Sequence, residues 1–316
     1  MKKPLAALII TAALTAPLAG CATTDTSANT PKITFMGEVY PLAWIASQVG
    51  GDRIQTSQIV PATASAHGYE LSPAQTDEIG KSSLVIYVKT LATAVDEAVE
   101  QAKPSSVIDV AAVIPTRPAI AHDHADEEAD HGDEEADHDH EAEGASGIDP
   151  HMWLNPATMP TLVSAVAAQL TTLDPEGAAS YTANATALNE KLSKLDADYA
   201  SGLSSCTQNT VIVTHPAFGY LTDQYHLTQV GISGFDEDTE PSPARLAEIA
   251  KTAEDNKTST IFFANTSNPK VAEVLANDLK LKTQVLSTLT AAPDGQDYLT
   301  LSEANLTALR DGLGCS

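Results

Sequence analysis

Four histidines lie outside the strongly acidic part of the chain: His67, His151, His215 and His226. The first three each lie in a loop beside an expected strand or helix start, whereas His226 has no such position and is expected at the surface. Neutral imidazole is a preferred ligand of Zn²⁺, and three imidazoles leave the fourth tetrahedral position for a carboxylate or a water. The three histidines therefore predict a zinc site.

Buried strands are expected to position two of these histidines. His67 lies between the apolar run 54–60 and a helix start at Ser72-Pro73, where Ser suits the N-cap and Pro the first helical position. His215 directly follows the apolar run 211–214. In doubly wound α/β folds, ligands bind outside the carboxyl ends of the strands, where both loops would lie. Since the two come from different halves of the chain, we expect the site in a cleft between two lobes.

The remaining histidine of the set, His151, follows a run of unusual composition. Residues 122–143 comprise five histidines, twelve acids and otherwise only Ala and Gly. Such a run cannot form a core, so we expect a disordered loop, and its imidazoles predict weak, auxiliary zinc binding. The alternative is a solvated acidic insert without a metal role. The five histidines are His122, His124, His131, His138 and His140. After His151, we expect a helix to begin at Asn155-Pro156.

Short β-branched apolar runs alternate with helical patterns along the chain, which is typical of an α/β fold with parallel sheets. In the first half, the expected strands are 33–36, 54–60, 84–88 and 107–110, and the expected helices are 40–49, one from 73 onward, and 92–102. In the second half, the expected strands are 211–214, 229–232, 260–263 and 283–286, and the expected helices are 218–225, 243–256, 269–279 and 298–313. We therefore expect two lobes, each with a four-stranded parallel sheet flanked by helices.

A long linking helix is expected to join the two lobes over residues 175–204. Its large apolar side chains recur at helical spacing and form one stripe: Tyr181, Leu188, Leu192, Leu195, Tyr199 and Leu203. Thirty residues at 1.5 Å each would span about 45 Å, which is enough to run along both lobes. A rigid spine of this kind favours a small rocking motion over a large hinge closure.

An internal repeat suggests candidates for the fourth ligand. Residues 70–81 and 240–251 are identical at seven of twelve positions, which we interpret as a duplication; a shared Ser-Pro-Ala helix start is the alternative. The alignment places Glu237 at the position equivalent to His67. We therefore expect the fourth ligand to be a water or a carboxylate of Asp236, Glu237 or Asp238. The alternative is that these acids only attract cations to the cleft.

The first residues have the pattern of an export signal. Residues 1–20 contain two early lysines, a short apolar stretch and small residues just before Cys21. This ending resembles the bacterial lipobox, so we expect a lipid on Cys21 and a polar tether over 21–31, with an ordinary secretory cleavage site as the alternative. The apolar stretch is too short for a permanent membrane-spanning helix. The two lobes would then occupy 32–174 and 205–316.

The remaining cysteines and the charge are typical of an exported, acidic protein. Cys206 and Cys315 are an even pair in an oxidising compartment, so we expect a disulfide between them. It would close a loop of about a hundred residues, worth up to ~4–5 kcal/mol in the chain-entropy description. The formal net charge is −25 and no basic patch is present in the sequence, which argues against nucleic acid as a partner.

The chain resembles the zinc-binding (cluster A-I) substrate-binding lipoproteins of bacterial metal ABC transporters. The resemblance covers nearly all of the mature chain and rests on Tyr40-Pro-Leu-Ala-Trp-Ile, His67-Gly-Tyr-Glu-Leu-Ser-Pro, Asp149-Pro-His-Met-Trp-Leu-Asn-Pro156, Thr214-His-Pro-Ala-Phe-Gly-Tyr220, Gly231-Ile-Ser-Gly234, Glu240-Pro-Ser-Pro-Ala-Arg and Asn305-Leu-Thr-Ala-Leu-Arg310. It implies two lobes of four parallel strands joined by a long helix, with a metal between them held by His67, His151 and His215.

The same resemblance implies the biological role. The protein would be a binding component rather than an enzyme, with Zn²⁺ as its transported ligand and an ABC permease and its ATPase as partners. We expect an extracytoplasmic monomer that a lipid anchors to the cell membrane. The alternatives are a manganese- or iron-binding homologue, a metal-dependent adhesin or buffer, and a zinc hydrolase. A set of three histidines favours zinc over manganese, and the sequence contains no His-Glu-x-x-His motif of a metalloprotease.

The chain departs from the family pattern mainly around the fourth ligand. Zinc members often have Glu where this chain has Ala264, and manganese members have Asp where this chain has Ser287 and Thr288. The first-ligand motif differs as well, since Ala66 and Gly68 flank the histidine. The resemblance therefore leaves the fourth ligand open.

Overall fold

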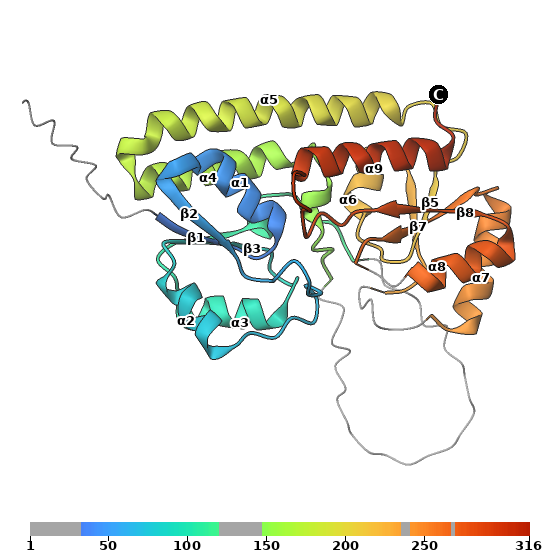
Figure 1. The fold of residues 1–316 in the computed structure, drawn as a ribbon, viewed down its shortest axis with the longest axis horizontal. Helices are drawn as coiled ribbons and strands as arrows, with labels where there is room; N and C mark the ends of the chain where they lie inside the picture. Colours follow the sequence, from blue (N-terminus) through green and yellow to red (C-terminus); the bar gives the residue numbers. More distant parts are fainter. Residues whose placement is uncertain (1–32, 120–146, 235–240, 267–268) are drawn as a thin grey trace, which may run out of the picture. The chain divides into compact units, whose positions relative to one another are not determined.

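Two parallel β-sheets, one in each half of the chain, form the frame of the protein (Figure 1). The structure, a computed structural model, describes residues 33–119, 147–234, 241–266 and 269–316. The strand order is β2-β1-β3-β4 in the first sheet and β6-β5-β7-β8 in the second. The same order in both sheets, with every pairing parallel, confirms the predicted α/β class with two four-stranded sheets.

The first lobe is built from the elements before the long helix. Its strands are β1 Ile33–Gly37, β2 Ile54–Gln58, β3 Leu84–Tyr87 and β4 Val107–Asp109. Its helices are α1 Tyr40–Gly50, α2 Pro73–Lys81, α3 Thr93–Ala102 and α4 Met159–Leu173, with 3-10 turns at Gly51–Arg53, Val110–Ala112 and Met152–Leu154. The expected helix start at Ser72 is confirmed: its side chain accepts from the amide of Gln75, and the Gln75 side chain accepts from the amide of Ser72, as a capping box.

The helix start predicted at Asn155-Pro156 is wrong. The segment instead forms a 3-10 turn at Met152–Leu154, and α4 begins only at Met159. The side chain of Asn155 accepts from the amide of Ala157 at 3.1 Å, so it caps a turn rather than a helix.

The second lobe repeats the plan of the first. Its strands are β5 Thr210–Val213, β6 Thr228–Gly231, β7 Thr260–Ala264 and β8 Lys282–Leu286. Its helices are α6 Gly219–Gln224, α7 Pro243–Asp255, α8 Pro269–Leu279 and α9 Tyr298–Leu313. The two segments that the sequence aligns, 70–81 and 240–251, contain α2 and the start of α7, which precede equivalent strands β3 and β7. The two aligned segments therefore lie at equivalent positions of the two lobes, and their origin by duplication stays an interpretation.

Alternate residues of the central strands enter separate cores on the two faces of each sheet. In β1, Phe35 packs with residues of α1 and α4, whereas Met36 packs with residues of α2 and α3. In β5, Val213 belongs to the large core that both lobes share, whereas Ile212 packs with α7 and α8. Both faces are covered, as parallel sheets require, which explains why the central strands β1, β3, β5 and β7 are largely apolar. Because helices cover the faces of the sheets, the carboxyl ends of the strands are left for the loops.

The long helix α5 spans Ala178–Gly202 and follows a 3-10 turn at Pro175–Gly177. The predicted apolar stripe is buried along its whole length. At 1.5 Å per residue its 25 residues extend about 37 Å. It packs on α1 and α4 of the first lobe and on α9 of the second, and Figure 1 shows it running along both groups. The helix therefore joins the two lobes as a spine.

The cysteines predicted to pair do form a disulfide. Cys206 lies just after α5 and Cys315 just after α9, and the two bonded cysteines are 109 positions apart in the sequence. The amide of Thr207 also donates to the carbonyl of Gly314 at 3.3 Å. The bond thus fastens the end of the spine helix to the end of the chain.

Several predictions lie outside the described residues. These are the export signal and tether with Cys21, the run 122–143 with its five histidines, and the acids Asp236, Glu237 and Asp238. Residues Lys32–Ser316 form one compact unit, and the predicted lobe limits at 174 and 205 stay a prediction. Among the described helices, none combines the length and the apolar character needed to cross a membrane.

Candidate metal centre

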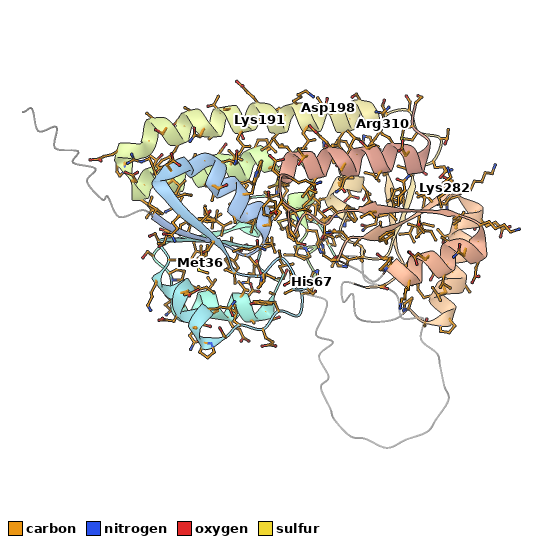
Figure 2. The ribbon with its side chains drawn as sticks, viewed as in Figure 1. Met36, His67, Lys191, Asp198, Lys282 and Arg310 are labelled. Atoms are coloured by element: carbon orange, nitrogen blue, oxygen red, sulfur yellow. A yellow bond between two sulfur atoms is a disulfide. The ribbon has the colours of Figure 1, made fainter. Side chains whose placement is uncertain are left out.

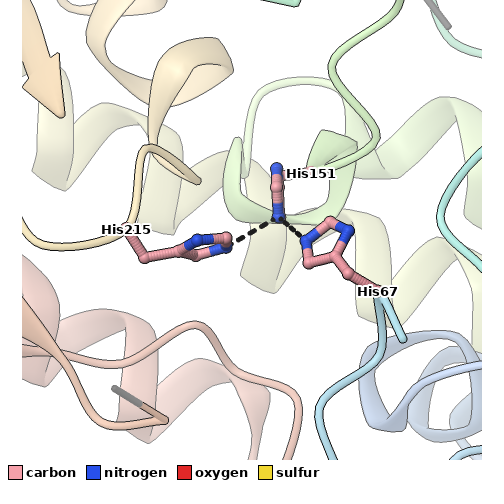
Figure 3. Close-up of side chains that lie close together, drawn as sticks. All are labelled: His67, His151 and His215. Carbon is pink, nitrogen blue, oxygen red and sulfur yellow. Dashed lines mark hydrogen bonds between the residues drawn. The ribbon is translucent and has the colours of Figure 1, made fainter. Parts of the chain in front are cut away.

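Three imidazoles from both lobes converge on one point between the sheets (Figure 3). Nε2 of His151 lies 3.1 Å from Nε2 of His67 and 3.1 Å from Nε2 of His215. Figure 2 labels His67 between the side chains of the two lobes. Within the described ranges, this triad is the one group of three or more His, Cys, Asp or Glu residues close enough to hold a metal ion together.

The spacing of the three nitrogens suits a zinc ion. With Zn–N distances of about 2.0–2.1 Å, the nitrogens of a tetrahedral site are separated by roughly 3.3 Å. The two separations of 3.1 Å are close to this value, and all three ligand atoms lie within 4.8 Å of one another. The residues present therefore fit a tetrahedral zinc ion with one position left for a fourth ligand.

Asp149 fixes the orientation of the His151 ring. Its Oδ1 accepts from Nδ1 of His151 at 2.8 Å and from the amide of His151 at 3.0 Å. Burial raises the pKa of Asp149, but hydrogen bonds and charge from His151, together with Arg117, outweigh burial and lower the pKa below its ordinary value. A carboxylate at Nδ1 makes that nitrogen the N–H donor, which leaves Nε2, the atom that faces the other two histidines, as the position for a metal ion.

The position of His215 is set by the end of β5. The amide of Thr214 donates to the carbonyl of Phe262 at 3.0 Å, and the hydroxyl of Thr214 accepts from the amide of Ala264 at 3.0 Å. Burial lowers the pKa of His215 well below its usual value, and the neighbouring His151 and His67 lower it further, against a hydrogen bond with the backbone of Gly234. His215 is therefore neutral at physiological pH, which is the form that binds metal.

Hydroxyl groups face the side of the triad that the histidines leave open. A small cavity of about 20 Å³ adjoins the three rings, and its other polar lining residues are Ser65, Thr266, Thr288 and Thr290. A cavity of this size holds about one water molecule. None of the described residues that line it is an acid. Apart from the indole of Trp153, the polar groups that the described chain places beside the triad are neutral hydroxyls, and the identity of the fourth ligand stays a prediction.

The position of Thr288 is fixed by both lobes. Its carbonyl accepts from Nε1 of Trp153 in the first lobe at 2.8 Å, and its amide donates to Oδ1 of Asn265 at 2.7 Å. Tyr298 in turn donates its hydroxyl to the carbonyl of Trp153 at 2.7 Å, and its ring stacks on Trp44 at 5.1 Å. These contacts connect the loop after β8 to the turn that carries His151.

The structure thus brings together His67, His151 and His215, whereas His226 is exposed, as expected. Ser287 is not among the residues that line the cavity, and its amide donates to Oδ1 of Asn305 at 2.7 Å. Sequence reasoning assigned no role to Asp149, although an acid two residues before a candidate ligand is a signal for a partner of that ligand. It also missed Thr290, for which the sequence carries no distinctive signal.

Comparisons with known proteins identify relatives of this chain. Residues 38–312 match the family described as zinc-uptake complex component A, periplasmic (ZnuA). The chain is 31% identical over 289 residues to the zinc-binding protein AdcA of Streptococcus pyogenes serotype M3 (strain ATCC BAA-595 / MGAS315), covering 88% of this chain and 56% of that protein. It is 30% identical over 322 residues to the high-affinity zinc uptake system protein ZnuA of Bacillus subtilis (strain 168), covering 99% of both. The chain spans little more than half the length of the streptococcal relative.

Solved structures show the same fold. Zn(II)-bound AdcA from Streptococcus pneumoniae matches with a TM-score of 0.73 at 29% identity, over 89% of this chain and 58% of that one. The metal-dependent lipoprotein YcdH from Bacillus subtilis matches with a TM-score of 0.72 at 27% identity, over 89% of this chain and 99% of that one. The resemblance predicted from the sequence motifs is confirmed: the chain belongs to the ZnuA family of zinc-uptake complex components.

Proposed function

We propose that this protein captures Zn²⁺ between its lobes and delivers it to a membrane permease. The observation that carries the proposal is the convergence of three Nε2 atoms, from His67, His151 and His215, at the spacing of a tetrahedral zinc site. The names of the relatives, a zinc-binding protein and a high-affinity zinc uptake protein, support the choice of cargo. Zinc is favoured over manganese because the donors are nitrogens and the surrounding side chains are neutral hydroxyls.

For the fourth ligand we propose a water, with a carboxylate of Asp236, Glu237 or Asp238 as the alternative. The cavity beside the triad has room for about one water, and Thr288 and Thr290, whose hydroxyl oxygens lie 3.2 Å apart, line it. Small neutral hydroxyls compete poorly with water for zinc, whereas they orient it well.

The setting of the protein is part of the same proposal. An export signal over 1–20 and a lipid on Cys21 would anchor the lobes outside the cytoplasm through the tether 21–31. An ABC permease with its ATPase would receive the metal, and we propose that the protein acts as a monomer without a nucleic-acid partner. A metal-dependent adhesin or buffer is the alternative. A neighbouring gene pair for a permease and an ATPase would favour transport.

A binding role is favoured over zinc hydrolysis by the surroundings of the triad. A zinc hydrolase requires an open position for water, a base that takes a proton from this water and an acid that protonates the leaving group. Among the described residues, those that line the cavity include no Asp, Glu or Lys. We therefore propose that the protein is not an enzyme, and that zinc-loaded protein has no esterase or peptidase activity.

Zinc titration of the whole chain tests the proposal. We expect one tight site in competition with a chelator of known affinity. Changing His67, His151 or His215 to Ala should weaken that site by more than the roughly 10–100-fold typical for loss of an outer partner of a ligand. The exposed His226→Ala is the matched control and should bind like wild type. Equal affinities in all four variants would contradict the proposal.

A further inference from the structure

Arg117 lies beside the metal centre and contacts both lobes. Its Nη1 donates to Oδ2 of Asp149 at 2.8 Å, and its Nε donates to Oδ2 of Asp223 on α6 at 2.8 Å. The side chains of Arg117 and Asp149 are 17% and 1% exposed, whereas that of Asp223 is 60% exposed. Charge-assisted hydrogen bonds are strong where they are buried and weak where solvent reaches them. The bond to Asp149 therefore contributes more to holding the guanidinium than the bond to Asp223.

The backbone of Arg117 is held by Asp149 and by Tyr220 of α6. Its amide donates to the hydroxyl oxygen of Tyr220 at 3.0 Å, and its carbonyl accepts from the amide of Asp149 at 3.0 Å. The hydroxyl of Tyr220 in turn donates to the carbonyl of Asp149 at 2.8 Å. Arg117, Asp149 and Tyr220 therefore form a closed set of hydrogen bonds between the first lobe and α6.

Gly219 provides the space for this arrangement. A Cβ atom at this position would lie 1.7 Å from Nη1 of Arg117 and 2.6 Å from Oδ2 of Asp149. Gly219 and Tyr220 belong to the segment that starts with His215. The segment that carries one candidate ligand therefore packs directly on the carboxylate that orients another.

We infer that Arg117 is a positioning residue that couples the orientation of His151 in the first lobe to the His215 segment of the second. By holding Oδ2 of Asp149, it fixes the carboxylate whose Oδ1 accepts from Nδ1 of His151, and thereby the direction of Nε2. Arg117 does not touch the metal. Tyr220 of α6 accepts from the amide of Arg117, and the guanidinium lies over its ring, 5.8 Å from the centroid, so the orientation of His151 depends on the placement of the second lobe. This inference rests on the zinc site proposed above.

The test compares three variants of the full chain. Arg117→Gln removes the charged contact with Asp149, Asp149→Asn weakens the acceptor for His151, and the third variant combines both. Asp223→Asn is the matched control, because it removes only the exposed partner of Arg117. The measurements are zinc affinity by chelator competition, and the visible absorption bands of Co²⁺-loaded protein, which report ligand geometry. Thermal unfolding of the metal-free variants separates a loss of fold from a loss of positioning.

Arg117→Gln should weaken zinc binding by about tenfold or more, which is the range for outer partners of metal ligands. It should also alter the Co²⁺ bands, and the double variant should bind no more weakly than Asp149→Asn, since the two residues act in one chain. Asp223→Asn should bind within about twofold of wild type, as exposed ion pairs contribute little. If Arg117→Gln does not fold, Arg117→Lys is measured in its place. We expect its zinc affinity to lie between that of wild type and that expected for Arg117→Gln, because Lys keeps the charge but lacks the planar fork of Arg.

Two results would overturn the inference alone. One is wild-type zinc affinity and unchanged Co²⁺ bands in folded Arg117→Gln or Arg117→Lys. The other is additive losses in the double variant. Wild-type protein without a tight zinc site would instead contradict the proposed function itself, and the inference with it.

Discussion

Nε2 of His215 lies 3.1 Å from Nε2 of His151, although the two residues belong to different lobes. The contact depends on the loop after β5 and on the 3-10 turn at Met152–Leu154, which meet at the carboxyl edges of the two sheets. A metal at this point would therefore bridge the lobes. Its affinity would report how well the spine helix α5 and the interlobe hydrogen bonds keep the lobes in register.

Deleting residues 122–143 should leave the tight zinc affinity nearly unchanged and remove additional weak sites. The three histidines that converge are held by folded elements on either side of the run, whereas the run adds only dispersed ligands. Calorimetric zinc titration distinguishes the two classes of site. We also expect slower loading of the deleted protein at low zinc.

The matched control for the deletion changes only the five histidines of the run to Asn and keeps its twelve acids. Loss of the weak sites in both variants would assign them to imidazole. A tenfold or larger weakening of the tight site in either variant would show that a residue of the run is a true ligand.

The metal-free protein should lose stability as the pH falls below about 6.5. Burial, followed by the neighbouring His151 and His67, lowers the pKa of His215 well below its usual value. The unfolded chain, in which this pKa returns to about 6.5, then takes up a proton more readily than the folded chain, so acid favours unfolding. Urea unfolding across about pH 5–8 measures this, and His215→Ala should reduce the slope.

Zinc affinity should fall over a similar range, because protons compete with zinc for each imidazole. For the urea unfolding measurements described above, His226→Ala is the control. This exposed side chain should leave the slope of the unfolding free energy against pH unchanged. An equal slope in wild type and His215→Ala would contradict the account of His215. Full zinc affinity well below about pH 5 would point to carboxylate ligands.

Changing Asp236, Glu237 and Asp238 together to Asn, Gln and Asn should weaken zinc binding clearly less than His215→Ala. The expectation follows from the proposal that water is the fourth ligand, so that the acids only raise the local cation concentration. Chelator competition at two salt concentrations distinguishes the two roles. Salt screens the attraction of cations to exposed acids more than it weakens direct coordination. A loss as large as that of a histidine would establish one of the three carboxylates as the ligand.

Replacing Cys206 and Cys315 by Ala should lower the free energy of unfolding by up to ~4–5 kcal/mol, the entropy of closing a loop of this length. Both cysteines lie at the ends of α5 and α9, on elements that carry none of the three histidines, so tight zinc binding should persist. Denaturant unfolding of the double variant, beside the oxidised and reduced wild type, measures the effect. A double variant as stable as the oxidised wild type would contradict it.

The sheets and the histidine positions could be predicted because their signals are local. Parallel strands with both faces covered, such as Thr210–Val213, are continuously apolar, and β5 and β7 can be recognised without knowledge of their neighbours. The loop that follows such a strand lies at the carboxyl edge, so His215 could be placed there from its sequence position alone. The helix start predicted at Asn155 was wrong because Asn and Pro occur in turns as readily as at the starts of helices.

The surroundings of the histidines could not be predicted because they depend on contacts between distant residues. Arg117 meets Tyr220 and Asp223 across 103 and 106 positions of sequence. Thr288 receives its hydrogen bond from Trp153 across 135 positions. No spacing rule connects such residues, since their proximity follows from the packing of the two lobes. The sequence therefore predicted the candidate zinc donors by residue type, and the fold was needed to identify what orients them.

The most direct test of the central claim is anomalous diffraction at the zinc absorption edge from crystals of the zinc-loaded full chain. The account predicts one strong peak between the lobes, about 2.0–2.1 Å from Nε2 of each of His67, His151 and His215. His151→Ala crystals, grown in the same way, should lose most of this peak. A strong peak elsewhere, or a peak between the lobes that contacts fewer than three of these nitrogens, would contradict the claim.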